Sequence, residues 1–162
     1  MKKEIYMDTA ASTMPSPSVV KIMNQVIDKF ANPSSMHDAG IIAREIINNA
    51  SNIISTKLNC FPKEINYTSG ATMSNNIAIQ GWMRKNPNGV LLLSSIEHND
   101  IILLAKYLQN HGRRVIFINV DHSGKLVLDE LENTITTYIN NTPFLLTCQM
   151  ANSETGIIQD IE

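Results

Sequence analysis

The stretch VLLLSSIEHNDIILLAKYLQNHGRRVIFI, residues 90–118, decides the fold class. Two short apolar runs, residues 90–93 and 115–118, flank a segment that has helical apolar spacing over about residues 100–110. Nearly continuous apolar strands separated by helices are typical of a mostly parallel sheet that is buried on both faces. The stretch therefore predicts a strand, a helix and a second strand of an α/β domain.

The same alternation continues on both sides of this stretch. Further strands are predicted at residues 65–67 and 144–147, and further helices over about residues 73–84 and 127–139. Turn-forming pairs supply the joints: Asn88-Gly89, His111-Gly112 and Ser123-Gly124. We therefore expect an α/β fold of alternating helices and mostly parallel strands.

The first part of the chain predicts two helices before the alternation begins. Ser16 and Pro17 are typical of an N-cap and a first-turn proline, and apolar residues then recur with helical spacing as far as Phe30. Pro33 ends this pattern because it disfavours the α conformation in the residue before it. A longer amphipathic helix is expected over about residues 37–58.

Composition excludes several classes of protein. The 162 residues carry 13 Lys+Arg against 15 Asp+Glu, and no basic stripe or tail favours nucleic acid or a membrane surface as a partner. No apolar run approaches the roughly 20 residues of a membrane-spanning helix, and the N-terminus lacks the apolar segment of a secretory signal. Two cysteines, Cys60 and Cys148, cannot form a disulfide framework, so we expect a cytoplasmic protein.

The loop Thr68-Ser69-Gly70-Ala71-Thr72 lies between a predicted strand and a predicted helix. The first turn of a helix has unpaired backbone N–H groups and partial positive charge, which favour a bound phosphate. Ligands of open α/β sheets bind beyond the carboxyl ends of the strands, where this loop falls. The alternative is a cluster of helix-capping hydroxyls that binds nothing.

Two more polar residues follow predicted strands and should lie at the same edge of the sheet. His98 comes after residues 90–93, where an imidazole can stack on an aromatic ligand or transfer a proton, or simply cap a helix. Asn152 comes after residues 144–147, where an amide can bind a ligand oxygen or close an Asx turn. Polar residues at three successive strand ends together indicate a ligand site.

Metal and thiol chemistry find no support in the sequence. The four histidines and two cysteines show no spacing typical of metal ligands, so no metal site is predicted. Cys60 follows a helix and Cys148 lies in an apolar strand, without a neighbouring group that would activate either thiol. We expect both to be packing residues.

The motifs resemble those of the cysteine desulfurases, pyridoxal-phosphate-dependent enzymes of the class V aminotransferase superfamily. YMDTAAST at residues 6–13 is similar to the family's Y-L-D-N-A-A-T-T, and NPSSMH at 32–37 is similar to N-P-S-S-x-H. YTSGATMSNN at 67–76, IEH at 96–98 and NSETG at 152–156 resemble F-T-S-G-A-T-E-S-N-N, I-E-H and N-N-E-T-G. The motifs occur in order along the whole chain.

This resemblance implies a function and a set of site residues. Ala71 and Thr72 would contact the phosphate of pyridoxal 5'-phosphate, and His98 would stack on its ring and assist catalytic proton transfer. Asn152 would bind the phenolic oxygen of the cofactor. The family removes sulfur from L-cysteine, which leaves alanine and an enzyme persulfide, and passes the sulfur to acceptor proteins in iron-sulfur cluster assembly. Family members are homodimers.

The chain also departs from the family pattern. Met73 replaces the usual glutamate, and the family's S-x-H-K Schiff-base lysine, its ring-nitrogen aspartate and its persulfide cysteine match nothing in residues 1–162. Without that lysine and aspartate, the cofactor chemistry is incomplete. We therefore expect an N-terminal arm, residues 1–16, followed by a partial cofactor-binding domain, residues 17–162. Such a chain would be inactive alone.

Two other interpretations remain open. In the first, the chain is a non-catalytic binding or dimerisation module. In the second, it belongs to a class V relative that acts on another amino acid. The strand at residues 65–67 pairs in the family with a strand from later in the sequence, so an open edge here predicts self-association. A complementary C-terminal chain would be a further partner.

Overall fold

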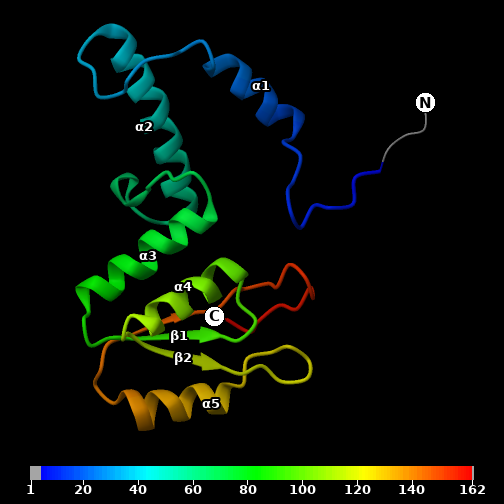
Figure 1. The fold of residues 1–162 in the computed structure, drawn as a ribbon. Helices are drawn as coiled ribbons and strands as arrows, with labels where there is room; N and C mark the ends of the chain where they lie inside the picture. The colour runs from blue at the N-terminus through cyan, green and yellow to red at the C-terminus, as the bar shows by residue number, and fades with distance from the viewer. Residues whose placement is uncertain (1–4, 162) are drawn as a thin grey trace. The chain divides into compact units, whose positions relative to one another are not determined.

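The computed structural model describes residues 5–161 and forms two compact units, Met1–Tyr67 and Thr68–Glu162 (Figure 1). The sequence offered no linker that would predict this division. The boundary between the units falls at the end of the segment that was expected to form the first strand. The arm expected over residues 1–16 and the domain expected over 17–162 stay predictions for the whole protein.

The second unit contains a three-stranded parallel sheet in the order β2-β1-β3. The central strand β1 (Val90–Ser94) pairs with β2 (Arg114–Ile118) on one side and with β3 (Phe144–Thr147) on the other. All five residues of β1 are buried. The predicted α/β fold and its parallel strands are thus confirmed, and each strand lies within one residue of the range expected from its apolar run.

Helices cover both faces of this sheet (Figure 1). Leu91 and Leu93 of β1 face a core built with α3 (Ala71–Lys85) and α4 (Asn99–Asn110). Because successive side chains of a strand point to opposite faces, Val90 and Leu92 pack on the other side. There they meet α5 (Leu128–Asn133) and the π-helix η2 (Thr134–Ile139). This double cover explains the uninterrupted apolar run of β1.

The first unit consists of helices. α1 (Pro17–Val26) begins as predicted, because the Ser16 hydroxyl accepts a hydrogen bond from the backbone N–H of Val19 over 3.4 Å. α2 (Asp38–Leu58) is followed by the short 3₁₀ helix η1 (Pro62–Glu64). No helix among residues 5–161 is long and apolar enough to cross a membrane.

The strand predicted at residues 65–67 is wrong. Ile65 has extended dihedral angles, but no described strand offers the hydrogen-bond ladder that would make residues 65–67 part of a sheet. The segment is instead fixed by a side chain, since the Tyr67 hydroxyl lies 3.0 Å from the Ser51 hydroxyl of α2. Apolar β-forming residues alone therefore did not produce a strand here.

The helix predicted over residues 127–139 is also different in the structure. It is α-helical only to Asn133 and then widens into η2, where the N–H of Asn140 bonds to the carbonyl of Ile135. Threonine hydroxyls explain the change, since Thr136 donates to the carbonyl of Glu132 over 2.9 Å. Side-chain bonds of this kind compete with the regular helical ladder.

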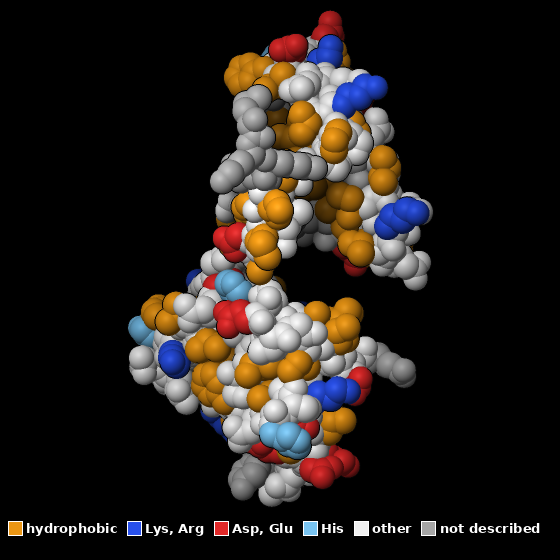
Figure 2. Space-filling view, turned by 90° about the vertical axis from the view of Figure 1, so that its right-hand side faces the viewer, with side chains coloured by type: hydrophobic (Ala, Val, Ile, Leu, Met, Phe, Trp, Pro, Cys, Tyr) orange, Lys and Arg blue, Asp and Glu red, His pale blue; other side chains and the backbone are white. Residues whose placement is uncertain are grey.

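Apolar side chains reach the surface in both units (Figure 2). The effect is strongest in α1, which has no buried residue. Ile22 is 60% exposed, Ile27 is 73% exposed and Phe30 is 94% exposed. The apolar spacing that predicted α1 therefore marks a face that the described residues of its own unit leave exposed.

Candidate functional site

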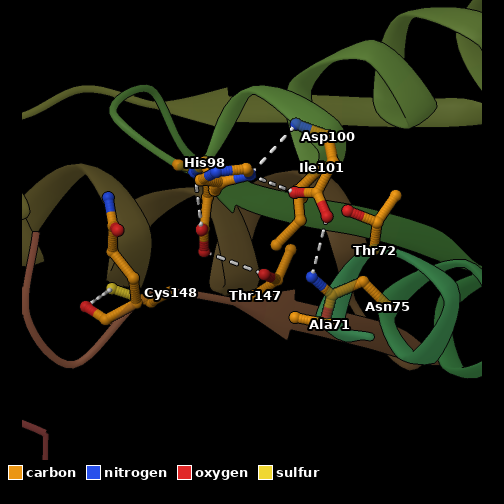
Figure 3. A pocket seen from close by; sticks show the side chains of 10 residues that line it. Ala71, Thr72, Asn75, His98, Asp100, Ile101, Thr147 and Cys148 are labelled. Carbon is orange, nitrogen blue, oxygen red and sulfur yellow. Dashed lines mark hydrogen bonds and ion pairs between the residues drawn. The ribbon is translucent and has the colours of Figure 1, made fainter. Parts of the chain in front are cut away.

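A pocket of about 370 Å³ lies in the second unit, beyond the carboxyl ends of β1 and β3 (Figure 3). It is formed by the start of α3, the turn between β1 and α4, and the residues that end and follow β3. This is where ligands of parallel α/β sheets bind. The lining residues are Ala71, Thr72, Asn75, Glu97, His98, Asp100, Ile101, Thr147, Cys148 and Gln149.

The first turn of α3 supplies the wall at Ala71 and Thr72. The helical ladder begins when the N–H of Ser74 bonds to the carbonyl of Gly70 over 3.1 Å. The backbone N–H groups of the first turn before it lie outside the ladder and are available to an anion. Thr68 braces this turn, because its hydroxyl lies 2.7 Å from the Ser74 hydroxyl. The start of α3 thus has free backbone donors, and its use as a phosphate site stays a prediction.

One hydroxyl of this loop is not available to the pocket. Ser69 donates its hydroxyl to the sulfur of Met73 over 3.3 Å. Ser69 is also absent from the pocket lining. The donors that reach the pocket from α3 are therefore the backbone and the side chains of Thr72 and Asn75.

His98 lies across the pocket and forms a close pair with Asp100 (Figure 3). It is the N-cap of α4, and its Nδ1 atom is 2.7 Å from Oδ1 of Asp100. The imidazole is 65% exposed, whereas the Asp100 side chain is 10% exposed. An exposed ring held by a nearly buried carboxylate is well placed to meet a ligand.

The carboxylate of Asp100 is held from two sides. Its Oδ2 atom accepts a hydrogen bond from the amide of Asn75 over 3.3 Å. Burial by itself would raise the pKa of Asp100, but hydrogen bonds from His98, Thr72 and Asn75 outweigh this, and the pKa lies below its ordinary value. Asp100 is therefore ionised at neutral pH and places a negative charge next to the imidazole.

Glu97 closes the floor of the pocket. This carboxylate is 5% exposed, and its Oε1 atom accepts a hydrogen bond from the Thr147 hydroxyl over 2.8 Å. Its Oε2 atom accepts a bond from the backbone N–H of His98 over 3.3 Å. Glu97 thereby ties the turn before α4 to the end of β3 and fixes the backbone that carries His98.

Cys148 lies in the pocket wall, directly after β3, and not within a strand as expected. Burial raises the pKa of its thiol, and the negative charge of Glu97 raises it further. A thiol of this kind stays protonated at neutral pH and is a poor nucleophile. The structure thus gives no support for thiol chemistry at Cys148.

Asn152 lies beside the pocket but does not line it. Its Nδ2 atom donates to the carbonyl of Ile96 over 3.2 Å, and its Oδ1 atom accepts from the N–H groups of Glu154 and Thr155, each over 2.9 Å. The amide therefore closes an Asx turn, which is one of the two roles that the sequence left open. Its contact with a cofactor stays a prediction.

Sequence reasoning missed the residues that support His98. Asp100 follows the histidine by two positions in a helical first turn, so its spacing was visible in the sequence. Asn75 gave no such signal, because its partner Asp100 lies 25 residues away. Glu97 stands in the IEH motif, but its contact with Thr147, 50 residues away, was not visible in the sequence. Among the residues described, no three His, Cys, Asp or Glu side chains come together as metal ligands would.

Comparison with known proteins agrees with this architecture. Residues 5–162 match the family described as aminotransferase class-V. Cysteine desulfurase IscS 1 of Archaeoglobus fulgidus is 40% identical over 160 residues, which cover 97% of this chain and 41% of the relative. The chain thus spans about two fifths of the length of the curated relatives that it matches.

Solved structures show the same likeness. A NifS-like protein superposes with a TM-score of 0.90 at 30% identity, over 98% of this chain and 43% of that chain. A structure described as SspA in complex with cysteine superposes with a TM-score of 0.86 at 35% identity, over 96% of this chain and 44% of that one. The fold described here is therefore an incomplete domain of these proteins.

Proposed function

Because the chain belongs to the class V aminotransferase family, we propose that it is the N-terminal part of a pyridoxal-phosphate-dependent cysteine desulfurase. The observation that carries this proposal is the meeting of Ala71, Thr72 and His98 in one pocket, although His98 is 26 residues from Thr72 along the chain. The motifs that resemble the family's phosphate loop and ring-stacking histidine thus face a common space.

The residues present fit the phosphate and ring of the cofactor. The pocket volume of about 370 Å³ lies in the range of small-molecule sites. The first turn of α3 offers N–H donors for the phosphate, and the exposed imidazole of His98 offers a flat surface for a ring. Among the residues that line the pocket there is no lysine, so the chain fits the cofactor through non-covalent contacts.

Each residue of the pocket has its own task in this proposal. The bound cofactor would supply an electron sink for the bonds around the amino acid's α-carbon. Ala71 and Thr72 would hold its phosphate and so fix its position. His98 would lie against the ring and carry a proton at an imidazole nitrogen, and Glu97 would keep the backbone of His98 in place. Asn152 would leave part of its Asx turn to reach the phenolic oxygen.

The substrate and partners follow from the same proposal. We expect L-cysteine as the substrate, a sulfur-acceptor protein as a partner, and iron-sulfur cluster assembly in the cytoplasm as the use of the sulfur. The lysine, aspartate and cysteine required for turnover match nothing in residues 1–162, so these residues alone should release no sulfide from L-cysteine. A segment with those groups would be needed to complete the site.

The proposed phosphate site is best tested with pyridoxine 5'-phosphate, which lacks the aldehyde and cannot react with surface lysines. We expect it to bind the purified chain in equilibrium dialysis at one site, and pyridoxine without phosphate to bind at least about tenfold more weakly. Equal binding of the two compounds, or no binding of either, would contradict the proposal.

The absence of a covalent anchor needs a separate measurement. After titration with pyridoxal phosphate and reduction with borohydride, intact mass analysis should show no stoichiometric adduct on one lysine. A single specific adduct would mean that this chain has its own Schiff-base lysine. That result would overturn the proposal that the chain is catalytically incomplete.

A homodimer is proposed for the same protein. The exposed apolar side chains of α1 and of the residues directly after it, namely Ile22, Ile27 and Phe30, support it, because apolar surfaces of this kind are normally covered by a partner. We expect light scattering to give a mass above that of the 18.0 kDa monomer. A clean monomer would count against this part of the proposal.

A further inference from the structure

Asp100 is a charged group of the pocket to which the proposed function assigns no task. Its side chain is 10% exposed and its carboxylate oxygens are both engaged, Oδ1 with His98 and Oδ2 with Asn75. A buried carboxylate aimed from α4 at an exposed imidazole suggests that it acts on the histidine.

The Nδ1 atom of His98 has two contacts that require opposite protonation states. Oδ1 of Asp100 lies 2.7 Å away and, as an ionised carboxylate oxygen, requires a proton on Nδ1. The backbone N–H of Asp100 lies 3.3 Å away and requires a lone pair on the same atom. The shorter contact involves a charge and is the stronger one. Nδ1 should therefore carry the proton.

We propose that Asp100 is a positioning residue that keeps the proton of the neutral His98 ring on Nδ1 and leaves the lone pair on Nε2. Nε2 is then the nitrogen that is free to accept a proton from a bound ligand. Glu97, the other carboxylate beside His98, binds the backbone N–H and does not compete for the ring. The catalytic use of this tautomer rests on the proposed function, but the tautomer itself does not.

The chain contains two histidines that serve as internal standards. His37 caps α2, and its Nδ1 atom accepts a bond from the N–H of Gly40 over 3.3 Å, so its proton is on Nε2. His111 has Nδ1 2.8 Å from the carbonyl of Tyr107, so its proton is on Nδ1. If the proposal is right, neutral His98 resembles His111, although its place as a helix N-cap is that of His37.

The test is a two-bond proton–nitrogen correlation spectrum of the ¹⁵N-labelled full chain, recorded where the imidazoles are neutral. The His98 signals are assigned by their loss in His98→Gln. We expect His98 to show a pyrrole-type Nδ1 and a pyridine-type Nε2, as His111 does. A His98 spectrum of the His37 type in the unmodified chain would overturn the proposal without the need for any further variant.

Asp100→Ala then asks whether the carboxylate is the cause. Without the carboxylate, Nδ1 of His98 is free to accept a hydrogen bond from the backbone N–H of residue 100. The ratio of the Nδ1–H tautomer of His98 to the Nε2–H tautomer should therefore fall about tenfold. Asp38→Ala is the matched control, since Asp38 is an acidic residue in the first turn of the helix that His37 caps. It should leave both His37 and His98 unchanged.

Asp100→Asn keeps the shape of the side chain and guards against a variant that fails to fold. Its single carbonyl oxygen must be shared between His98 and Asn75, so the Nδ1–H fraction should fall here too, by less than in the alanine variant. An unchanged ratio in both variants would overturn the role of Asp100. Failure of pyridoxine 5'-phosphate to bind, with the tautomer result intact, would remove the proposed function and leave this inference standing.

Discussion

The two compact units use apolar residues in different ways. In Thr68–Glu162, the five residues of β1 are buried between helices on both faces of the sheet. In Met1–Tyr67, the buried residues of the long helix α2 are small, namely Gly40, Ala43, Ser51 and Ser55, and α1 has none. The sheet unit, Thr68–Glu162, therefore has an apolar core, whereas the helical unit, Met1–Tyr67, has exposed apolar faces.

This difference shows what apolar periodicity can and cannot predict. A period of 3.6 residues predicts that a helix has an apolar face, but it does not identify the surface that covers that face. The strands carry more information, because a run that is apolar on both faces requires cover on both faces. The stability of the helical unit should therefore depend on individual hydrogen bonds, such as the Ser16 cap and the bond between Ser51 and Tyr67.

The largest effect is expected from truncation in the core of the sheet. Leu92 is fully buried, so Leu92→Ala should reduce the free energy of unfolding of its unit by about 3 kcal/mol. Leu58→Ala is the matched change in the helical unit, where the side chain is 66% exposed, and should cost less than about 0.5 kcal/mol.

Urea denaturation followed by tryptophan fluorescence measures the first of these changes directly. The single tryptophan, Trp82, packs against the core of the second unit. Circular dichroism of the same samples measures the loss of helix and so also follows the unfolding of the first unit. Similar losses for the two leucine variants would mean that the helical unit has a core of its own, and the comparison would fail.

A smaller loss of stability is expected at Gly40, where the start of α2 lies against the backbone of the preceding loop. A Cβ atom on Gly40 would lie 2.7 Å from the backbone oxygen of Ser35 and 2.9 Å from that of Asn32, so Gly40→Ala should destabilise this region by about 2 kcal/mol. Gly81→Ala in α3 meets open space and should stabilise its helix by up to about 1 kcal/mol.

Hydrogen exchange measured by mass spectrometry separates the two glycine variants. Faster exchange should appear in peptides from residues 32–58 for Gly40→Ala, with the sheet peptides unchanged. Gly81→Ala should slow exchange within residues 71–85. If Gly40→Ala also loosened the sheet, the two units would not be independent in stability.

Much of the second unit was predictable from the sequence because its signals are local. The apolar runs at 90–93, 115–118 and 144–147 each form a strand whose bounds lie within one residue of the run. The segment at 65–67 was mispredicted because a strand also needs a neighbour, and no residue within the segment determines whether one exists. Threonine bonds that convert residues 134–139 into a π-helix are likewise a property of the folded turn.

The candidate site was predictable in part for the same reason. Ala71, Thr72 and His98 follow from the rule that ligands bind at strand ends and helix starts, and the structure places them on one pocket. The spacing of Asp100 after His98 was visible in the sequence, whereas the contacts of Asn75 with Asp100 and of Glu97 with Thr147 emerge only once α3, α4 and β3 are packed together. Polar contacts between elements distant in sequence leave no periodic pattern from which to predict them.

The smallest expected effect is that of low pH on the second unit. A fall in pH should lower the free energy of unfolding of this unit and bring it closer to that of the helical unit. The pKa of Asp100 in the folded chain lies below its ordinary value of 3.8, so the folded state favours the ionised form. This contribution to stability is fully present above the ordinary value and is lost as the pH falls through the lower folded value. The second unit should therefore weaken between about pH 5 and about pH 2.

Asp100→Asn isolates this contribution, because an amide does not titrate. The variant should be less stable than the unmodified chain at about pH 6, and the difference should shrink as the pH falls below the ordinary value of 3.8 towards the lower pKa of folded Asp100. Urea midpoints from Trp82 fluorescence, measured for both chains across this pH range, give the difference in stability. The other carboxylates are the same in both chains, so their contributions cancel. A difference that stays constant with pH would show that Asp100 stabilises the unit by its shape and not by its charge. In that case folding would not lower the pKa of Asp100, and this carboxylate would not make the more buried unit sensitive to acid.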